Sequence, residues 1–235
     1  MIYLSVIIPA YNEELRIKGT LDIVIEYFKN KNYETEIFIV DDGSKDKTVE
    51  IIQEYSKKNP MVSLLQNPGN QGKGAAVKRG MMNAQGKYLL FSDADLSAPI
   101  SDTDRLIPYL EQGYDIAIGS RNIKDENVKV VAVPKRMVMG RVFHLIVQSL
   151  ILPGYKDTQC GFKLFKNDVA KHLFSLQKID RFSFDVEILY LAKRHGYKVK
   201  EVAVNWTHVD NSRVSLLRDP LNMFKDILQI KRLHP

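Results

Sequence analysis

Cysteine is nearly absent from this sequence, since Cys160 is the one residue of its type among 235. A single thiol excludes a disulfide within the chain and suits a reducing compartment. Free cysteine is also one of the most frequently buried residue types, so we expect Cys160 to be a small core side chain.

Long hydrophobic runs are absent as well. No stretch reaches the roughly 18 apolar residues that would span a bilayer. The first residues lead directly into a strand-like pattern, so we expect no signal peptide. Neither repeats, low-complexity segments nor a linker divide the chain, and a hydrophobic content of 45% is enough for one large core.

Two common nucleotide-binding motifs are missing. The loop Gly72-Lys73-Gly74 lacks the Walker spacing Gly-x-x-x-x-Gly-Lys-Ser/Thr, and no Gly-x-Gly-x-x-Gly follows the first expected strand. P-loop and dinucleotide-binding readings are therefore excluded. The loop either presents Lys73 and a helix N-terminus to a phosphate group or simply allows close helix packing.

Positive charge is present in excess, with 34 Lys and Arg against 28 Asp and Glu, a net charge of +6. The excess is local: residues 121–141 carry six basic and two acidic side chains, and residues 213–235 carry five and two. This favours anionic partners such as nucleotides or phospholipids. Few aromatics interleave the basic segments, which argues against nucleic acid. An inactive basic binding protein would explain the charge but not the acidic and glycine motifs described next.

Short apolar runs alternate with helical patterns over the first 120 residues. This alternation predicts a doubly wound, mostly parallel sheet with helices on its faces. The expected strands are 3–9, 35–40, 62–65, 89–92 and 116–119, with helices between them, including one at 75–84.

Polar clusters follow the first four expected strands, and the carboxyl ends of parallel strands meet at one edge of a sheet. Asp93 and Asp95 form an oxygen-only pair suited to Mg²⁺ or Mn²⁺, although an Asp can also simply cap a turn. Asp41 can accept hydrogen bonds from a base or ribose, or belong to a turn and helix cap at Asp42-Gly43-Ser44.

Seven motifs together resemble the inverting family-two glycosyltransferases of GT-A fold, over roughly residues 3–210. Five of them lie at 6–14 (VIIPAYNEE), 40–44 (VDDGS), 70–75 (NQGKGA), 93–95 (DAD) and 119–121 (GSR). Two more, at 157–163 (DTQCGFK) and 181–187 (RFSFDVE), are similar to dolichyl- or polyprenyl-phosphate hexosyltransferases, especially the glucosyltransferase branch.

The resemblance implies a site for a nucleoside diphosphate sugar and a divalent cation, Mg²⁺ or Mn²⁺. The expected donor-binding residues are Pro9, Tyr11, Glu13, Asp41, Lys73 and Asp93, and the expected metal ligands are Asp93, Asp95 and His208. The histidine has a structural role as its alternative. Mannosyl members usually continue the acidic motif with Leu-Gln-His-Pro, whereas this chain has Leu96-Ser97-Ala98-Pro99. We therefore prefer UDP-glucose to GDP-mannose as the donor.

Two kinds of acceptor remain open. A lipid phosphate is already anionic and needs cationic residues, for which the candidates are Arg121, Arg136, Arg141 and Arg213. A saccharide hydroxyl would need a carboxylate to take its proton, for which Asp157 and Asp185 are the candidates. Candidate catalytic residues are therefore Asp157, Asp185, Arg121, Arg136 and Arg141.

Two amphipathic helices are expected in the second half, at 137–152 and after Asp219-Pro220, where Leu221, Phe224 and Leu228 share a face. Either they pack in the core or they lie on a membrane surface. We expect one GT-A domain at 1–210, with a nucleotide-binding half at 1–120 and an acceptor half at 121–210, and a basic amphipathic segment at 211–235. The expected location is peripheral, on the cytoplasmic face of a membrane.

Overall fold

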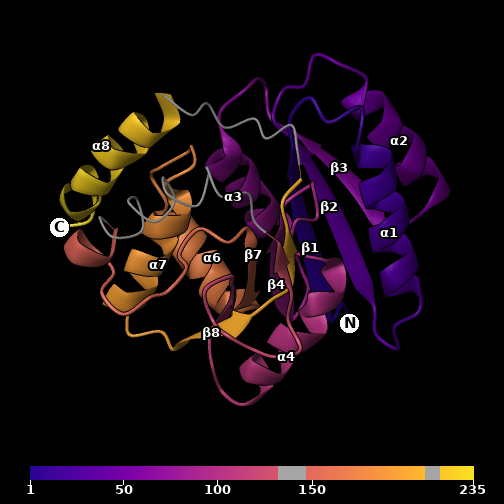
Figure 1. Ribbon diagram of the computed structural model, residues 1–235. Coiled ribbons are helices and arrows are strands. Elements are labelled where there is room, and N and C mark those ends of the chain that lie inside the picture. Colours follow the sequence, from indigo (N-terminus) through magenta and orange to yellow (C-terminus); the bar gives the residue numbers. More distant parts are fainter. Residues whose placement is uncertain (132–146, 210–217) are drawn as a thin grey trace.

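A seven-stranded sheet forms the centre of the computed structural model, which describes residues 1–131, 147–209 and 218–235. Its strand order is β3-β2-β1-β4-β7-β5-β8 (Figure 1). The strands are β1 (Leu4–Ala10), β2 (Thr35–Asp41), β3 (Val62–Gln66), β4 (Tyr88–Ser92), β5 (Ile116–Ser120), β7 (Phe162–Lys166) and β8 (Val199–Ala203). The five strands and the mostly parallel sheet expected from the sequence are confirmed.

Strand β7 runs in the opposite direction to its neighbours. It pairs antiparallel with both β4 and β5, whereas β5 and β8 pair in parallel. The sequence pattern did not indicate this strand, because Lys163 interrupts the apolar residues that mark a buried strand. Residues from beyond position 120 therefore complete the same sheet as the first five strands.

Helices cover both faces of the sheet and enclose two separate hydrophobic cores (Figure 1). One core includes apolar residues of α1 (Ile17–Lys29), α2 (Thr48–Lys58) and α4 (Thr103–Glu111). The other includes residues of α3 (Lys73–Asn83), α6 (Asn167–Leu176), α7 (Phe184–Arg194) and α8 (Arg218–Leu233). The short elements are the 3₁₀ helix η1 (Ile100–Asp102) and a two-stranded sheet of β6 (Val130–Val131) and β9 (Trp206–Thr207).

Helix α8 lies on the outside of the molecule beside α7 (Figure 1). Its Ile227 and Ile230 are buried, whereas Phe224 and Leu228 are exposed. The helix expected after Asp219-Pro220 is thus present. The other expected helix, at 137–152, lies largely outside the described residues, which include one helical turn at 147–150. Among the described residues, no helix has the length and apolar character needed to cross a membrane.

Close packing of α3 on the sheet depends on Gly80. A Cβ atom placed there would lie 2.4 Å from Cγ2 of Ile7 and 3.1 Å from Cγ2 of Val40. Gly19 in α1 is a matched contrast, because a Cβ there would meet no atom within 4 Å.

We predict that Gly80→Ala lowers the free energy of unfolding by about 1–3 kcal/mol through overpacking, even though alanine favours the helix. Gly19→Ala, by contrast, should raise it by up to about 1 kcal/mol. Urea unfolding measures both. Equal stability of the two variants would show that α3 does not approach β1 as closely as described.

Candidate active site

The two acids that follow β4 lie at the carboxyl edge of the sheet. The backbone N–H of Asp93 donates to the carbonyl of Gly161 at 3.1 Å, which joins the end of β4 to the start of β7. Asp95 accepts from the backbone N–H of Ser97 at 2.9 Å. Leu96, which lies between Asp95 and Ser97, has a φ of 47°. Such a value is rare for a bulky residue, and strained residues of this kind cluster at functional sites.

Lys73 connects the glycine-rich loop to the first of these acids. Its Nζ lies 2.6 Å from Oδ1 of Asp93 and 5.2 Å from the centre of the Phe91 ring. The flanking glycines allow close packing, because Cβ atoms at Gly72 and Gly74 would lie 2.4 Å and 2.7 Å from the carbonyl oxygens of Asp180 and Ile179. The close packing considered for this loop is therefore observed, and the presentation of Lys73 to a phosphate group stays a prediction.

The charges around Asp93 are strongly coupled. Burial raises the pKa of the Asp93 carboxyl, and the nearby Asp95 and Asp185 raise it further, against the opposing effect of Lys73. Burial disfavours the charged form of Lys73, yet Asp93 and Asp185 raise its pKa above the usual value. Negative charge is thus concentrated here, and added positive charge would stabilise it.

Arg121 and Asp157 form a bidentate ion pair. Nε of Arg121 donates to Oδ2 of Asp157 at 2.7 Å, and an η nitrogen donates to Oδ1 at 2.8 Å. The Arg121 backbone N–H also donates to Oδ2, at 3.0 Å. The guanidinium carbon lies 5.4 Å from the centre of the Trp206 ring, within cation–π range. The sequence placed both residues among the catalytic candidates, and the structure brings them together.

This pair shifts the ionisation of both partners. Burial by itself would raise the pKa of Asp157, but Arg121 lowers it below the usual value. Burial disfavours the Arg121 cation, and Asp157 more than compensates by raising the pKa of the guanidinium. Both side chains are therefore charged at neutral pH.

Asp185 lies in a second, more deeply buried pair. Nζ of Lys163 donates to Oδ1 of Asp185 at 2.5 Å and to the carbonyl of Cys160 at 2.6 Å. Sequence reasoning missed Lys163, since a lysine within an apolar strand is normally assigned to the solvent face. The sequence candidate Asp185 is thus present at the site, and its role as a general base stays a prediction.

At the other side of the edge, the loop after β1 is bonded to the loop after β2. Asn12 donates its backbone N–H to Oγ of Ser44 at 2.8 Å, and the backbone N–H of Glu13 donates to Thr48 at 2.7 Å. Glu13 forms an ion pair with Arg16. Pro9 and Tyr11 are partly exposed beside these contacts.

The two acids that end β2 have different partners. Asp41 accepts from the backbone N–H groups of Gly43 and Ser44, so it forms the turn that the sequence offered as its alternative role. Asp42 was not singled out, yet its carboxylate accepts from Asn67 at 2.8 Å and from the backbone N–H of Gly72, also at 2.8 Å. Its adjacency to Asp41 in the motif was the available signal. Asp42 thus fixes the loop that carries Lys73.

Asp93 and Asp95 offer the carboxylate oxygens that Mg²⁺ or Mn²⁺ prefers as ligands. The carboxylate of Asp93 rests on the backbone of Gly161, where a Cβ atom would come within 2.1 Å of Oδ2. Thr207 donates its backbone N–H to the carbonyl of Ser97 at 2.9 Å, which places the predicted ligand His208 next to the acidic loop. Among the described residues, no three His, Cys, Asp or Glu side chains are grouped to hold a metal ion.

Three candidate residues cannot be compared with this geometry. Arg136, Arg141 and Arg213 lie outside the described residues. Of the four predicted acceptor-phosphate residues, the structure therefore places Arg121 alone at the edge.

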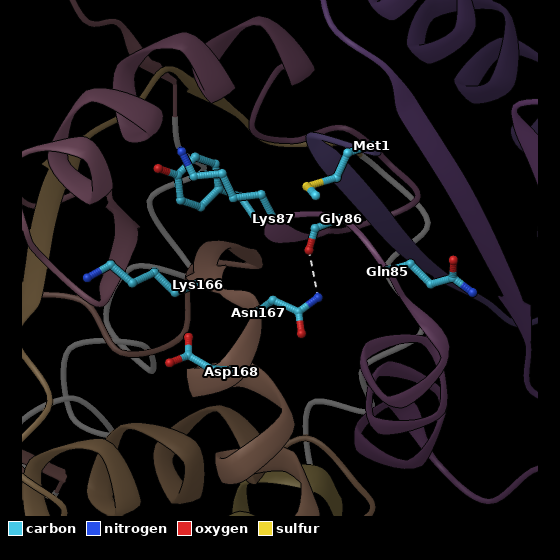
Figure 2. A pocket seen from close by; sticks show the side chains of 8 residues that line it. Met1, Gln85, Gly86, Lys87, Lys166, Asn167 and Asp168 are labelled. Carbon is cyan, nitrogen blue, oxygen red and sulfur yellow. Dashed lines mark hydrogen bonds between the residues drawn. The ribbon is translucent and has the colours of Figure 1, made fainter.

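A separate cavity of about 530 Å³ opens at the opposite edge of the sheet (Figure 2). It lies where β4 begins at Tyr88 and β7 ends at Lys166, far from the acids that follow β4. Nδ2 of Asn167 donates across it to the carbonyl of Gly86 at 2.6 Å. Because the cavity lies at that opposite edge, it is separate from the cluster of acids and bases described above.

Solved structures share this arrangement of strands and helices. Glucosyl-3-phosphoglycerate synthase from Mycobacterium tuberculosis in complex with uridine diphosphate superposes with a TM-score of 0.71 at 18% identity, over 98% of this chain and 80% of that chain. The same synthase with Mn²⁺, UDP-glucose and glycerol 3-phosphate gives 0.69 at 16% identity, over 97% and 78%. The fold is therefore the GT-A fold of glycosyltransferases.

Sequence comparison defines the family. Residues 5–174 match the family model described as Glycosyl transferase family 2. The chain is 41% identical to a dolichyl-phosphate beta-glucosyltransferase of Dictyostelium discoideum, with 98% of this chain and 74% of that relative covered. The human dolichyl-phosphate beta-glucosyltransferase is 34% identical, with 97% and 74% covered. The chain belongs to glycosyl transferase family 2, which confirms the resemblance seen in its motifs.

The Arg121–Asp157 pair predicts a pH-dependent contribution to stability. Because the folded protein lowers the pKa of Asp157, the contribution is present above the usual value of about 3.9 and is lost as the pH falls through the lower folded value. Asp157→Asn should lower the free energy of unfolding by about 2 kcal/mol at pH 7. That is less than the roughly 3–5 kcal/mol of a fully buried pair, since Arg121 is 32% exposed.

Urea unfolding between pH 7 and pH 3 measures this difference, which should shrink below about pH 4. Asp168→Asn, at an exposed position on the opposite edge, is the matched control; because Asp168 lies in the first turn of α6, its deficit should not exceed about 1 kcal/mol at any pH. A deficit of equal size at every pH would contradict the charge pair.

Proposed function

We propose that the protein is an inverting glucosyltransferase that transfers glucose from UDP-glucose to a polyprenyl phosphate such as dolichyl phosphate. The observation that carries the proposal is the identity of 34–41% with dolichyl-phosphate beta-glucosyltransferases over nearly the whole chain. A neighbour of the same fold that binds Mn²⁺ and UDP-glucose supports the choice of donor and metal.

The donor diphosphate is assigned to the edge formed by Lys73, Asp93 and Asp95. A divalent cation, Mg²⁺ or Mn²⁺, bound by Asp93 and Asp95 would neutralise the charge that develops on the leaving diphosphate. The ammonium group of Lys73 is held at this edge by Asp93 and supplies a further positive charge beside it. Pro9, Tyr11, Glu13 and Asp41 are assigned to the nucleoside side, and His208 remains the predicted third metal ligand.

The acceptor phosphate is assigned to Arg121, with Arg136, Arg141 and Arg213 as the further predicted contacts. One oxygen of the lipid phosphate would attack the anomeric carbon of glucose, and the bond from that carbon to the diphosphate oxygen would break with inversion. The electron pair leaves with UDP. A phosphate monoester is already anionic, so no general base is needed. Asp157 then serves to orient Arg121, whose guanidinium it holds by two hydrogen bonds.

A direct assay tests donor and acceptor together. The protein is incubated with Mn²⁺, one donor (UDP-glucose or GDP-mannose) and one acceptor (dolichyl phosphate or a saccharide). We expect glucosyl lipid from UDP-glucose and dolichyl phosphate. Asp95→Asn should reduce the rate by about 10²- to 10³-fold, whereas Asp168→Asn should retain it. Product from the saccharide alone would replace this proposal with glycan synthesis, and mannosyl lipid would replace glucose with mannose.

Peripheral binding to the cytoplasmic face of a membrane would bring the lipid acceptor to the site. Phe224 is 38% exposed and Leu228 50% exposed on the outermost helix, α8. Lys225, Lys231 and Arg232 are exposed on the same helix. Such an apolar face flanked by cations fits the interface of an anionic membrane.

Vesicle flotation tests this surface. Phe224→Ser/Leu228→Ser should weaken binding to vesicles containing phosphatidylserine by at least about tenfold, because each inserted side chain contributes about 1.5–3 kcal/mol. Ile23→Ser changes an exposed residue of α1 and should leave binding unaltered. If the double variant floats as well as the unaltered protein, α8 is not the contact.

A further inference from the structure

Lys163 is an unusual residue for the middle of a central strand. It lies in β7 between β4 and β5, and its side chain is 2% exposed. Strand alternation turns Phe162 and Leu164 toward the core of α1 and α4, so Lys163 faces the core of α3 and α7. Its partner Asp185, in the first turn of α7, is 6% exposed.

Stability alone gives a weak reason for such a pair. Removing two charges from water costs so much that apolar replacement of a buried ion pair is often neutral or stabilising. The contacts of the pair therefore indicate what else it does.

Lys163 holds the backbone that supports Asp93. Its Nζ donates to the carbonyl of Cys160 at 2.6 Å, which fixes the peptide leading to Gly161. The Gly161 carbonyl in turn accepts the backbone N–H of Asp93 at 3.1 Å, and the Asp93 carboxylate lies so close that a Cβ on Gly161 would come within 2.1 Å of it. Asp185 accepts a second hydrogen bond from Lys163 Nζ and so holds that nitrogen beside the Cys160 carbonyl.

Two aromatic rings, Phe91 and Phe184, pack beside the Lys163–Asp185 pair. The Phe184 ring, adjacent in sequence to Asp185, packs edge-on against Phe91 with centroids 5.6 Å apart. The ammonium groups of Lys73 and Lys163 lie 5.2 Å and 5.9 Å from the centre of that Phe91 ring. Phe91 belongs to β4, two residues before Asp93, so the pair and the acid share one packed unit.

We propose that Lys163 and Asp185 are positioning residues that fix the Cys160–Gly161 backbone beneath Asp93, and thereby set the carboxylate for a divalent cation bound to a nucleoside diphosphate. The inference rests on the metal role in the proposed function. It gives Asp185 a part that differs from the general base considered above. Neither residue of the pair needs to touch the substrate for this role.

The test removes both charges at once, so that no unpaired ion stays buried. Lys163→Met/Asp185→Asn should remain folded, while the Kd for UDP in Mn²⁺, measured by calorimetry, should rise about 10- to 100-fold, as for other groups that orient metal ligands. The Kd for UDP without Mn²⁺ should change by less than about threefold. A purely structural pair would alter unfolding but not this Mn²⁺ dependence, so unchanged Mn²⁺-dependent affinity would overturn the proposal.

A matched control exists on the same strand. Lys166 ends β7 and forms an ion pair with Asp115 at 2.9 Å, at the edge of the sheet away from the acids. Lys166→Met/Asp115→Asn should leave UDP binding unchanged with and without Mn²⁺. An equal loss of Mn²⁺-dependent affinity in this variant would overturn a specific role for Lys163 and Asp185.

Gly161→Ala disturbs the contact between Gly161 and the Asp93 carboxylate directly, and it tests the proposal if the double variant does not fold. It should weaken Mn²⁺-dependent UDP binding by a similar factor, and full affinity in folded Gly161→Ala would overturn the proposal. When all three changes are combined, the losses should be less than multiplicative, because they act through one contact. If the unaltered protein shows no Mn²⁺-dependent UDP binding, the proposed metal role fails first and this inference falls with it.

Discussion

The reversed direction of β7 is the constraint on which the whole site depends. Because β7 runs antiparallel to β4 and β5, the residues that precede it meet the residues that follow both neighbours. Gly161 therefore supports Asp93, and Asp157 reaches Arg121. A parallel strand in this place would carry the same loop to the opposite edge, about 17 Å away over five residues. One change of strand direction thus brings the acids that follow β4 and the Arg121–Asp157 pair to the same edge of the sheet.

Charge pairing explains how so many acids occupy one edge. Asp93, Asp157 and Asp185 each contact a cation, namely Lys73, Arg121 and Lys163. Within the described part of the chain, Asp95 has no such partner and accepts a backbone N–H instead. Negative charge without a cationic partner therefore remains at Asp95, where a bound divalent cation would be stabilised.

The sequence was informative where local rules determine structure. Strand ends and turn residues are enough to predict that Asp41, Asp93 and Asp95 lie at one edge, because the carboxyl ends of parallel strands share an edge. The sequence did not reveal the buried ion pair of Lys163 and Asp185, because the two residues are 22 positions apart and neither residue type is typical of a core. The sequence likewise does not distinguish Asp42 from Asp41, because the contact of Asp42 with the Gly72 loop is set by the tertiary structure. Partners far apart in the chain are set by topology, which periodicity does not encode.

Contacts between distant segments also show that residues 1–120 and 121–210, the predicted nucleotide-binding and acceptor halves, are not structurally independent. The Asp180 carbonyl accepts the backbone N–H of Ala75, at the start of the helix that carries Lys73. Glu187, fully buried in α7, holds the preceding loop through the backbone N–H groups of Lys178 and Ile179, both at 2.9 Å, and contacts Nε2 of His234 at 2.7 Å. The loop before α3, which we assign to the donor, is thus supported by the segment that leads into α7. The position of Lys73 therefore depends on contacts that only the complete sheet and both of its helical layers provide.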